Sequence, residues 1–194
     1  MKRFNFLIIM LLIFITTSTC LIADDDKDLK KHPGYVNFDE IDIPKDAEET
    51  VEVYVRGPLL RLIAKATEHE DPGVSEILEK LLLIRVNTFS IDAGQADNLK
   101  PKISKIEKDL EKQKWEKVVR VKEREELVNI YMKLDDKDRI VGLVVMAIED
   151  GDEAVFVNIV GETDWEAIGK IGRKLDIDEF RYFSEDDSPR KRRK

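Results

Sequence analysis

The stretch from Arg139 to Gly161 constrains the fold of this chain more than any other. It contains two apolar runs of strand length, joined by an acidic turn centred on Asp150-Gly151. Asp-Gly between apolar runs predicts a β-hairpin, because both central residues of the tight turn adopt positive φ. Residues 140–148 place apolar side chains on both faces of the first strand. Both faces of the hairpin must be covered by other parts of the protein, which favours a central position in a sheet. The hairpin could bind a partner only if one of its faces remained exposed.

The segments before the hairpin predict further strands and helices. Val51 to Val55 alternates as a strand, and Gly57-Pro58 ends it and starts a helix, because proline suits the first helical turn. Asp71-Pro72 repeats this start signal, with Asp71 as the N-cap. Leu82 to Ile91 has strand character, and the change of apolar phase between Val86 and Phe89 indicates a bulge.

Next comes an amphipathic helix, predicted to start near Asn98 with Pro101 in its first turn. Two strands follow this helix, and the second is predicted to have one apolar face and one solvent-exposed face. A short edge strand is also predicted near the N-terminus. After the hairpin, the spacing of Thr163 and Glu166 predicts a capping box and a final helix. The two strands after the amphipathic helix cover Lys117–Lys122 and Leu127–Leu134, and the short N-terminal strand covers Tyr35–Phe38.

The element order is therefore β-α-α-β-α-β-β-β-β-α. It predicts an α+β fold, with helices packed on a single mixed, mainly antiparallel β-sheet of about five to six strands. The predicted organisation is a signal peptide over 1–23, a flexible N-terminal segment over 24–50, a single α+β domain over 51–183 and a disordered acidic and basic tail over 184–194.

The first residues predict export. Lys2 and Arg3 precede an apolar run from Phe4 to Ile15, and the small residue Ala23 precedes Asp24. This is the pattern of a secretory signal peptide cleaved between Ala23 and Asp24, and the run is shorter than the roughly 20 residues that span a bilayer. An uncleaved anchor is one alternative. Acylation of Cys20 is another, although Thr17 and Thr19 do not match a lipoprotein signal.

Charge and cysteine content narrow the class of protein. Cleavage after Ala23 removes Lys2, Arg3 and Cys20, so the net charge falls from −8 to −10 and no cysteine remains. An exported chain without disulfides must be stabilised by its core. An acidic chain is also a poor ligand for nucleic acid, and membrane contact is expected only if Cys20 is acylated or the signal is retained.

The sequence contains no recognisable catalytic or phosphate-binding motif. His69, Glu70 and Asp71 are residue types that bind metal ions. Neighbours in sequence rarely bind the same ion, however, and Asp71 is the predicted N-cap. We therefore predict no catalytic, cofactor-binding or metal-binding residue. Asn158, in an apolar strand, must be hydrogen-bonded if it is buried. Asn158 and Trp165 are the two candidate partner contacts.

Several motifs together resemble one family of exported bacterial proteins. Its closest match is the end of the hairpin, Glu153 to Gly161, and the remaining motifs are Lys31 to Phe38, Gly57-Pro58-Leu59-Leu60, Asp71-Pro72, Ile84-Arg85-Val86 and Trp115 to Val121. The chain is similar over Lys31 to Leu175 to the family catalogued as domain of unknown function 4252. The resemblance implies a signal-bearing envelope protein, sometimes lipid-anchored, and it carries over no activity, ligand or catalytic residue.

Three functions remain open from the sequence. The first is an exported protein of the periplasm or cell envelope that is not an enzyme and binds an unknown envelope protein or a second copy of itself. The second is a periplasmic carrier of an apolar ligand or lipid. The third is a carboxylate-based hydrolase. The two-faced apolar hairpin favours the first.

Overall fold

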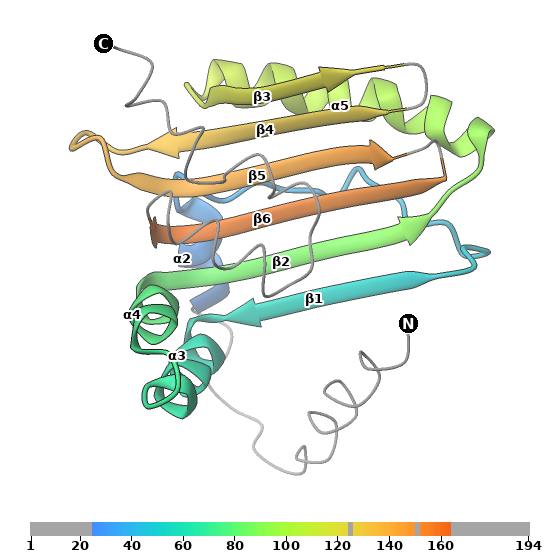
Figure 1. The fold of residues 1–194 in the computed structure, drawn as a ribbon. Coiled ribbons are helices and arrows are strands. Elements are labelled where there is room, and N and C mark those ends of the chain that lie inside the picture. Colours follow the sequence, from blue (N-terminus) through green and yellow to red (C-terminus); the bar gives the residue numbers. More distant parts are fainter. Residues whose placement is uncertain (1–24, 124–125, 150–151, 164–194) are drawn as a thin grey trace.

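The computed structural model describes residues 25–123, 126–149 and 152–163. Its centre is one six-stranded sheet in the order β1-β2-β6-β5-β4-β3, with every neighbouring pair antiparallel (Figure 1). The α+β class and the predicted order of elements are confirmed. The strands are β1 (Thr50–Arg56), β2 (Leu81–Ser90), β3 (Glu116–Lys122), β4 (Leu127–Leu134), β5 (Ile140–Glu149) and β6 (Glu153–Thr163), and the helices are α2 (Asp25–Lys31), α3 (Gly57–Thr67), α4 (Pro72–Lys80) and α5 (Ala93–Lys112).

The predicted hairpin occupies the middle of the sheet. β5 and β6 pair with each other, and β4 and β2 flank them. Both faces of β5 are buried from Ile140 to Ile148, as the lack of polar alternation in its sequence requires. The central position of the hairpin is therefore confirmed.

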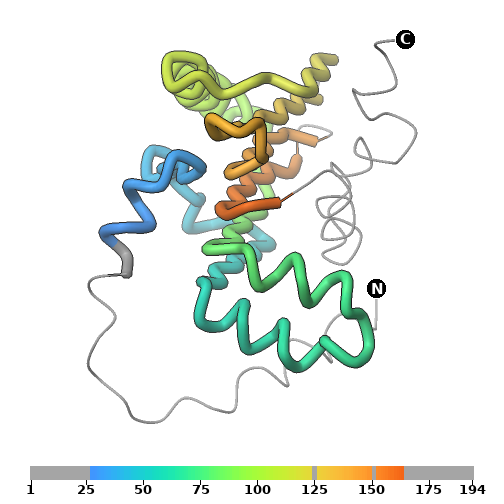
Figure 2. The backbone as a smooth tube through the Cα atoms, turned by 90° about the vertical axis from the view of Figure 1, so that its left-hand side faces the viewer, coloured from blue at the N-terminus to red at the C-terminus, as the bar shows by residue number. Residues whose placement is uncertain are grey.

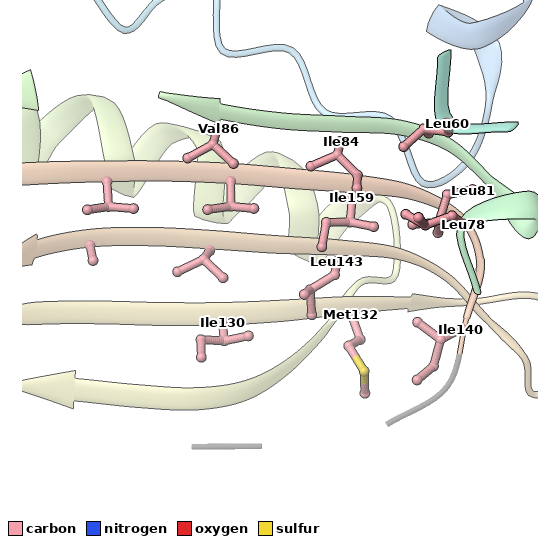
Figure 3. Close-up of a cluster of buried hydrophobic side chains, with 14 of the residues drawn as sticks. Leu60, Leu78, Leu81, Ile84, Val86, Ile130, Met132, Ile140, Leu143 and Ile159 are labelled. Carbon is pink, nitrogen blue, oxygen red and sulfur yellow. The ribbon is translucent and has the colours of Figure 1, made fainter. Parts of the chain in front are cut away.

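One face of the sheet carries α3 and α4, and we call it the α3 face. Its apolar side chains form one cluster with Leu60 of α3 and Leu78 of α4 (Figure 3). The two helices contact β1, β2 and β6, which are neighbouring strands at one side of the sheet. Asp71 caps α4 as predicted, because its Oδ1 accepts a hydrogen bond from the Val74 N–H at 3.1 Å.

The opposite face carries α5 and the segment after α2, and we call it the α5 face (Figure 2). Leu99, Ile103 and Leu110 of α5 pack in one cluster with Phe156 of β6 and Phe38 of the N-terminal segment. The prediction of a solvent-exposed face on β4 is wrong, because Tyr131 and Asn129 on this side are fully buried and α5 packs against Tyr131.

Helix α5 starts five residues before the predicted start. Asp92 is its N-cap and forms a capping box with Gln95, so Pro101 lies inside the helix and not in its first turn. The capping box bonds two donors that have no partner within the helix. This local stabilisation explains why the helix begins at Ala93 although its apolar stripe starts later.

Two predicted strand features differ from the structure. Pairing with β1 and β6 runs without a shift from Val86 to Phe89, and the bulge lies instead near Leu81 and Leu83. The apolar phase changes because Val86 packs on the α3 face and Phe89 on the α5 face. Residues 35–38 form no strand; they cross the α5 face, where Val36 and Phe38 are buried.

The segment over 24–50 is predicted to be flexible from its charge, and the structure shows where most of it lies. Residues 25–31 form α2, and Leu29 packs against Leu83 and Val160 of the sheet. The predicted turn residues Asp150 and Gly151, the predicted final helix and the predicted tail lie outside the described residues.

Candidate functional site

Strand β1 forms one edge of the sheet and presents backbone groups along that edge. The Ser90 N–H donates to the Glu49 carbonyl at 3.0 Å, so residues 49 and 90 are a hydrogen-bonded pair. In an antiparallel ladder such pairs alternate with pairs whose N–H and C=O groups point away. Val51, Val53 and Val55 therefore point their backbone groups at β2, and Thr50, Glu52, Tyr54 and Arg56 point theirs outward.

The opposite edge, β3, carries the features with which proteins protect an edge. Lys117, Arg120 and Lys122 place repeated positive charge along it, and its pairing with β4 is interrupted between Lys117 and Val119. Lysines and bulges discourage a further strand from pairing. Strand β1 (TVEVYVR) contains neither lysine nor proline, and its pairing with β2 is regular. The two edges therefore differ, and within the described part of the chain β1 is the edge that lacks these protective features.

Exposed apolar side chains occur on β1 itself, on α3 directly after it and at the start of β2, its partner strand. In the described part of the chain five large apolar side chains are strongly exposed, and all lie between residues 51 and 82. Tyr54 is 49% exposed and Leu62 of α3 is 63% exposed. Figure 1 shows α3 at the end of β1, on the outer side of the sheet. We call this set the β1 patch; its members are Val51, Tyr54, Leu59, Leu62 and Leu82.

The two sides of β1 have different chemistry. Val53 and Val55 pair with Val86 and Ile84, so they lie on the α3 face and pack against its cluster. Glu52 and Tyr54 lie on the α5 face, where they pair with Asn87 and Arg85.

Polar groups of β2 continue the α5 side of the edge. The Arg85 Nε donates to Asn87 Oδ1 at 3.1 Å, and Asn87 Nδ2 donates to Glu52 Oε2 at 3.5 Å. The Arg85 guanidinium also lies 5.6 Å from the centre of the Phe38 ring. Tyrosine and arginine are enriched at protein–protein interfaces, and β1 carries one of each, Tyr54 and Arg56.

Asn158, one of the predicted partner contacts, is fully buried in the centre of the sheet. Its Oδ1 accepts from the Val36 N–H at 2.9 Å, and its Nδ2 donates to the carbonyls of Gly34 and Leu143 at 3.0 and 3.1 Å. Asn158 therefore joins the N-terminal segment to the hairpin, and this structure does not present it at the surface.

The other residues predicted for sites fall outside the described ranges. They are the second partner candidate Trp165, the cleavage residues Ala23 and Asp24, and the acylation candidate Cys20.

A group of titratable side chains joins α5 to β3 and β4. The Tyr131 hydroxyl donates to Glu107 at 3.0 Å, and the Lys117 amino group lies 3.4 Å from Glu107 and 3.3 Å from Glu111. Burial raises the pKa of Tyr131 to about 12, and a hydrogen bond with Tyr131 raises the pKa of Lys117. Both pKa values move away from neutrality, whereas a general acid or base has a pKa near the working pH. This group holds elements together and does not resemble a catalytic site.

Metal-binding and membrane-spanning features are absent from residues 25–123, 126–149 and 152–163. No three histidine, cysteine, aspartate or glutamate side chains there are grouped to hold a metal ion. None of the helices in those ranges is both long and apolar enough to cross a bilayer. Of the predicted triplet, Asp71 caps α4, and His69 and Glu70 are exposed in the turn before it.

The β1 patch was not predicted from the sequence. Val51 to Val55 was identified as a strand, but alternation alone does not say which strand forms an edge. The available signal was the contrast between TVEVYVR and the lysine-containing EKVVRVK of β3.

Comparison with known protein families gives a match that covers most of the described chain. The model of a family described as "Domain of unknown function (DUF4252)" matches residues 43–171, which include β1, α3 and the central hairpin. No curated protein and no solved structure matches the chain.

Proposed function

The chain belongs to the DUF4252 family, and we propose that it is an exported envelope protein that acts by binding another protein through β1 and the β1 patch. The single observation that carries the proposal is that β1 is an edge strand of the described sheet and that exposed apolar side chains lie on it and next to it. An exposed strand edge offers hydrogen bonds to an extended partner, and neighbouring apolar side chains supply buried area.

Export is supported by the N-terminal sequence. Lys2 and Arg3 followed by the apolar run to Ile15 match the plan of a signal peptide, with cleavage between Ala23 and Asp24. The periplasm or cell envelope is then the place of action. If Cys20 were acylated instead, the same domain would act while attached to a membrane.

The experiment that tests the proposal places a photo-crosslinking amino acid at residue 54 of the whole 194-residue chain. A matched control places it at residue 120, an exposed position on β3. Both proteins are produced in a cell that exports them, irradiated in intact cells and recovered from the envelope. Crosslinking at residue 54 to one discrete partner, with little at residue 120, supports the proposal. No crosslink at residue 54, or equal crosslinking at both positions, contradicts it.

A further inference from the structure

We propose that the protein that binds the β1 edge is a second copy of this chain. Two β1 strands would pair antiparallel about a two-fold axis at Tyr54, which would join two six-stranded sheets into one. This inference rests on the proposed function, because it names the partner of the same edge. Two-fold pairing of identical surfaces is the commonest way in which soluble chains form dimers.

The backbone of β1 permits this pairing. Glu52, Tyr54 and Arg56 point their N–H and C=O groups away from β2, as the hydrogen-bonded pair of Glu49 and Ser90 shows. With the axis at Tyr54, that residue faces its own copy, and Glu52 faces Arg56 of the second copy. Every directly opposed pair of these residues is then a hydrogen-bonded pair, so the two edges supply matching donors and acceptors.

The side chains select this register. Glu52 lies opposite Arg56 of the second copy, and the symmetry repeats this pair of opposite charges. On the α3 face, Val53 lies opposite Val55 of the second copy, so apolar side chains also meet twice. Pairs of opposite charge and pairs of β-branched side chains both stabilise antiparallel strands when they face each other directly. Moving the axis to Val53 would keep the backbone pairing, but it would place Glu52 opposite Tyr54 and Arg56 opposite Thr50, without a charge pair.

The exposed side chains of the β1 patch lie where the two copies would meet. With the axis at Tyr54, Val51 faces Gly57 of the second copy, which is the first residue of α3. Val51 is 44% exposed and lies on the same face of the sheet as α3. The start of α3 therefore lies beside the seam, at the β1 side of the molecule (Figures 1 and 2), and Leu59 and Leu62 are exposed on this helix.

The second copy fits this edge better than an unrelated strand does on two grounds. Any extended peptide could use the backbone groups, but the repeated pairing of Glu52 with Arg56 needs these residues at these positions on both strands. Strand β3 carries the positive side chains Lys117, Arg120 and Lys122, and its pairing with β4 is interrupted between Lys117 and Val119. Self-association is thus favoured at β1 and opposed at β3.

Charge exchange between two variants tests the proposal. The whole chain is produced with export intact, purified from the envelope, and its mass in solution is measured by light scattering during size exclusion. Glu52→Arg places like charges at both pairs of a dimer, and so does Arg56→Glu. Each variant should raise the dimer dissociation constant at least about tenfold. In an equimolar mixture, a dimer of one copy of each variant brings the substituted position 52 opposite the substituted position 56, where the two new side chains have opposite charges. The mixed dimer should therefore form at the protein concentration at which the wild type dimerises.

A cysteine pair checks the register in the same protein with Cys20→Ser. Tyr54→Cys should form a disulfide between copies, because opposed Cα atoms of a hydrogen-bonded pair lie about 5.5 Å apart. Val53→Cys should not, since residues 53 would lie diagonally at roughly 7–8 Å.

The outcomes separate this inference from the proposed function. A wild-type dimer, two monomeric single variants and a restored mixed dimer support the inference. A monomeric wild type, a mixture that stays monomeric, or a disulfide at residue 53 and not at 54 overturns it. If residue 54 then still crosslinks in cells to a species of different mass, the proposed function stands with another partner. If residue 54 crosslinks to nothing, both fall.

Discussion

Gly34 and Gly142 lie backbone against backbone on the α5 face of the sheet. A Cβ at Gly142 would lie 2.5 Å from the Gly34 Cα and 2.7 Å from the Trp115 ring, and a Cβ at Gly34 would overlap the Val141 carbonyl oxygen. The N-terminal segment can cross β5 at this distance only because neither residue carries a side chain. The contact places Gly34 where its carbonyl accepts from Asn158.

Gly142→Ala should therefore destabilise the protein by about 3 kcal/mol, because the added methyl group meets backbone that cannot move aside alone. Chemical denaturation followed by circular dichroism measures the effect. Gly94→Ala is the matched control. Its Cβ would approach no atom closer than the Asp92 side-chain oxygen at 3.2 Å, in the exposed first turn of α5, so a change within about 1 kcal/mol is expected. Equal effects of the two substitutions would contradict the close packing.

Two buried asparagines should respond in opposite directions to the same substitution. Asn158 makes three hydrogen bonds, whereas neither polar side-chain atom of Asn129 has a partner, and both residues are fully buried. Asn158→Leu should cost about 3 kcal/mol, because it leaves the Val36 N–H and the Gly34 carbonyl without their partner. Asn129→Leu should stabilise by about 1 kcal/mol, because it replaces a buried amide without partners by a side chain of similar size. Urea midpoints of the two variants decide this, and a loss of stability in both would show that Asn129 is satisfied in solution.

The turn between β4 and β5 should make the protein sensitive to acid. Asp135 accepts from the N–H groups of Arg139 and Lys137, both at 2.9 Å, and it pairs with the Arg139 guanidinium at 2.6 Å. Bonds from the Arg139 backbone and side chain lower the pKa of Asp135 from 3.8 to about 2. A lowered carboxyl pKa contributes stability that is present above about pH 4 and is lost as the pH falls from about 4 to 2.

Asp135→Asn should remove this part of the pH dependence, so the melting temperature of the variant should fall less steeply between about pH 4 and 2. Asp136→Asn makes the same change of charge one residue along, at an exposed position, and should leave the wild-type slope. Identical slopes in wild type and Asp135→Asn would show that the turn does not hold the carboxylate as described.

At alkaline pH the group around Tyr131 should weaken the fold. The pKa of Tyr131 is raised from 10.0 to about 12, mainly by burial, and the pKa of Lys117 is also raised. A raised pKa favours the protonated form in the folded state, so its contribution is complete below about pH 10 and is lost as the pH rises towards about 12. Tyr131→Phe should reduce the loss of melting temperature over that range. An unchanged profile would contradict the assignment to Tyr131.

The centre of the sheet was predictable because its sequence leaves few choices. Two apolar runs without polar alternation around an Asp-Gly turn need cover on both faces, and the middle of a sheet provides it. Pro58 and Pro72 marked the starts of α3 and α4 for an equally local reason, since proline fits the first helical turn. These features depend on residues close together in the chain.

What was missed depends on contacts between distant segments. Asn129 and Lys133 made one face of β4 look solvent-exposed. Helix α5 packs on that face instead, for example through the contact of Tyr131 with Glu107, which is 24 residues away in sequence. The phase change at Phe89 looked like a bulge because two different faces of one strand were both buried. The edge position of β1 follows from strand order, which single-strand patterns do not contain. The candidate site was therefore found from the structure alone.

Residue-level amide hydrogen exchange on the purified wild-type chain shows whether a further strand pairs with the β1 edge. The amide of Val53 bonds within the sheet and should exchange slowly in any case, whereas the amide of Glu52 points outward and is protected only if a strand pairs with the edge. We expect Glu52 to exchange about as slowly as Val53 in the wild type and much faster in Arg56→Glu. Fast exchange at Glu52 in the wild type, at concentrations where Val53 is protected, would contradict it.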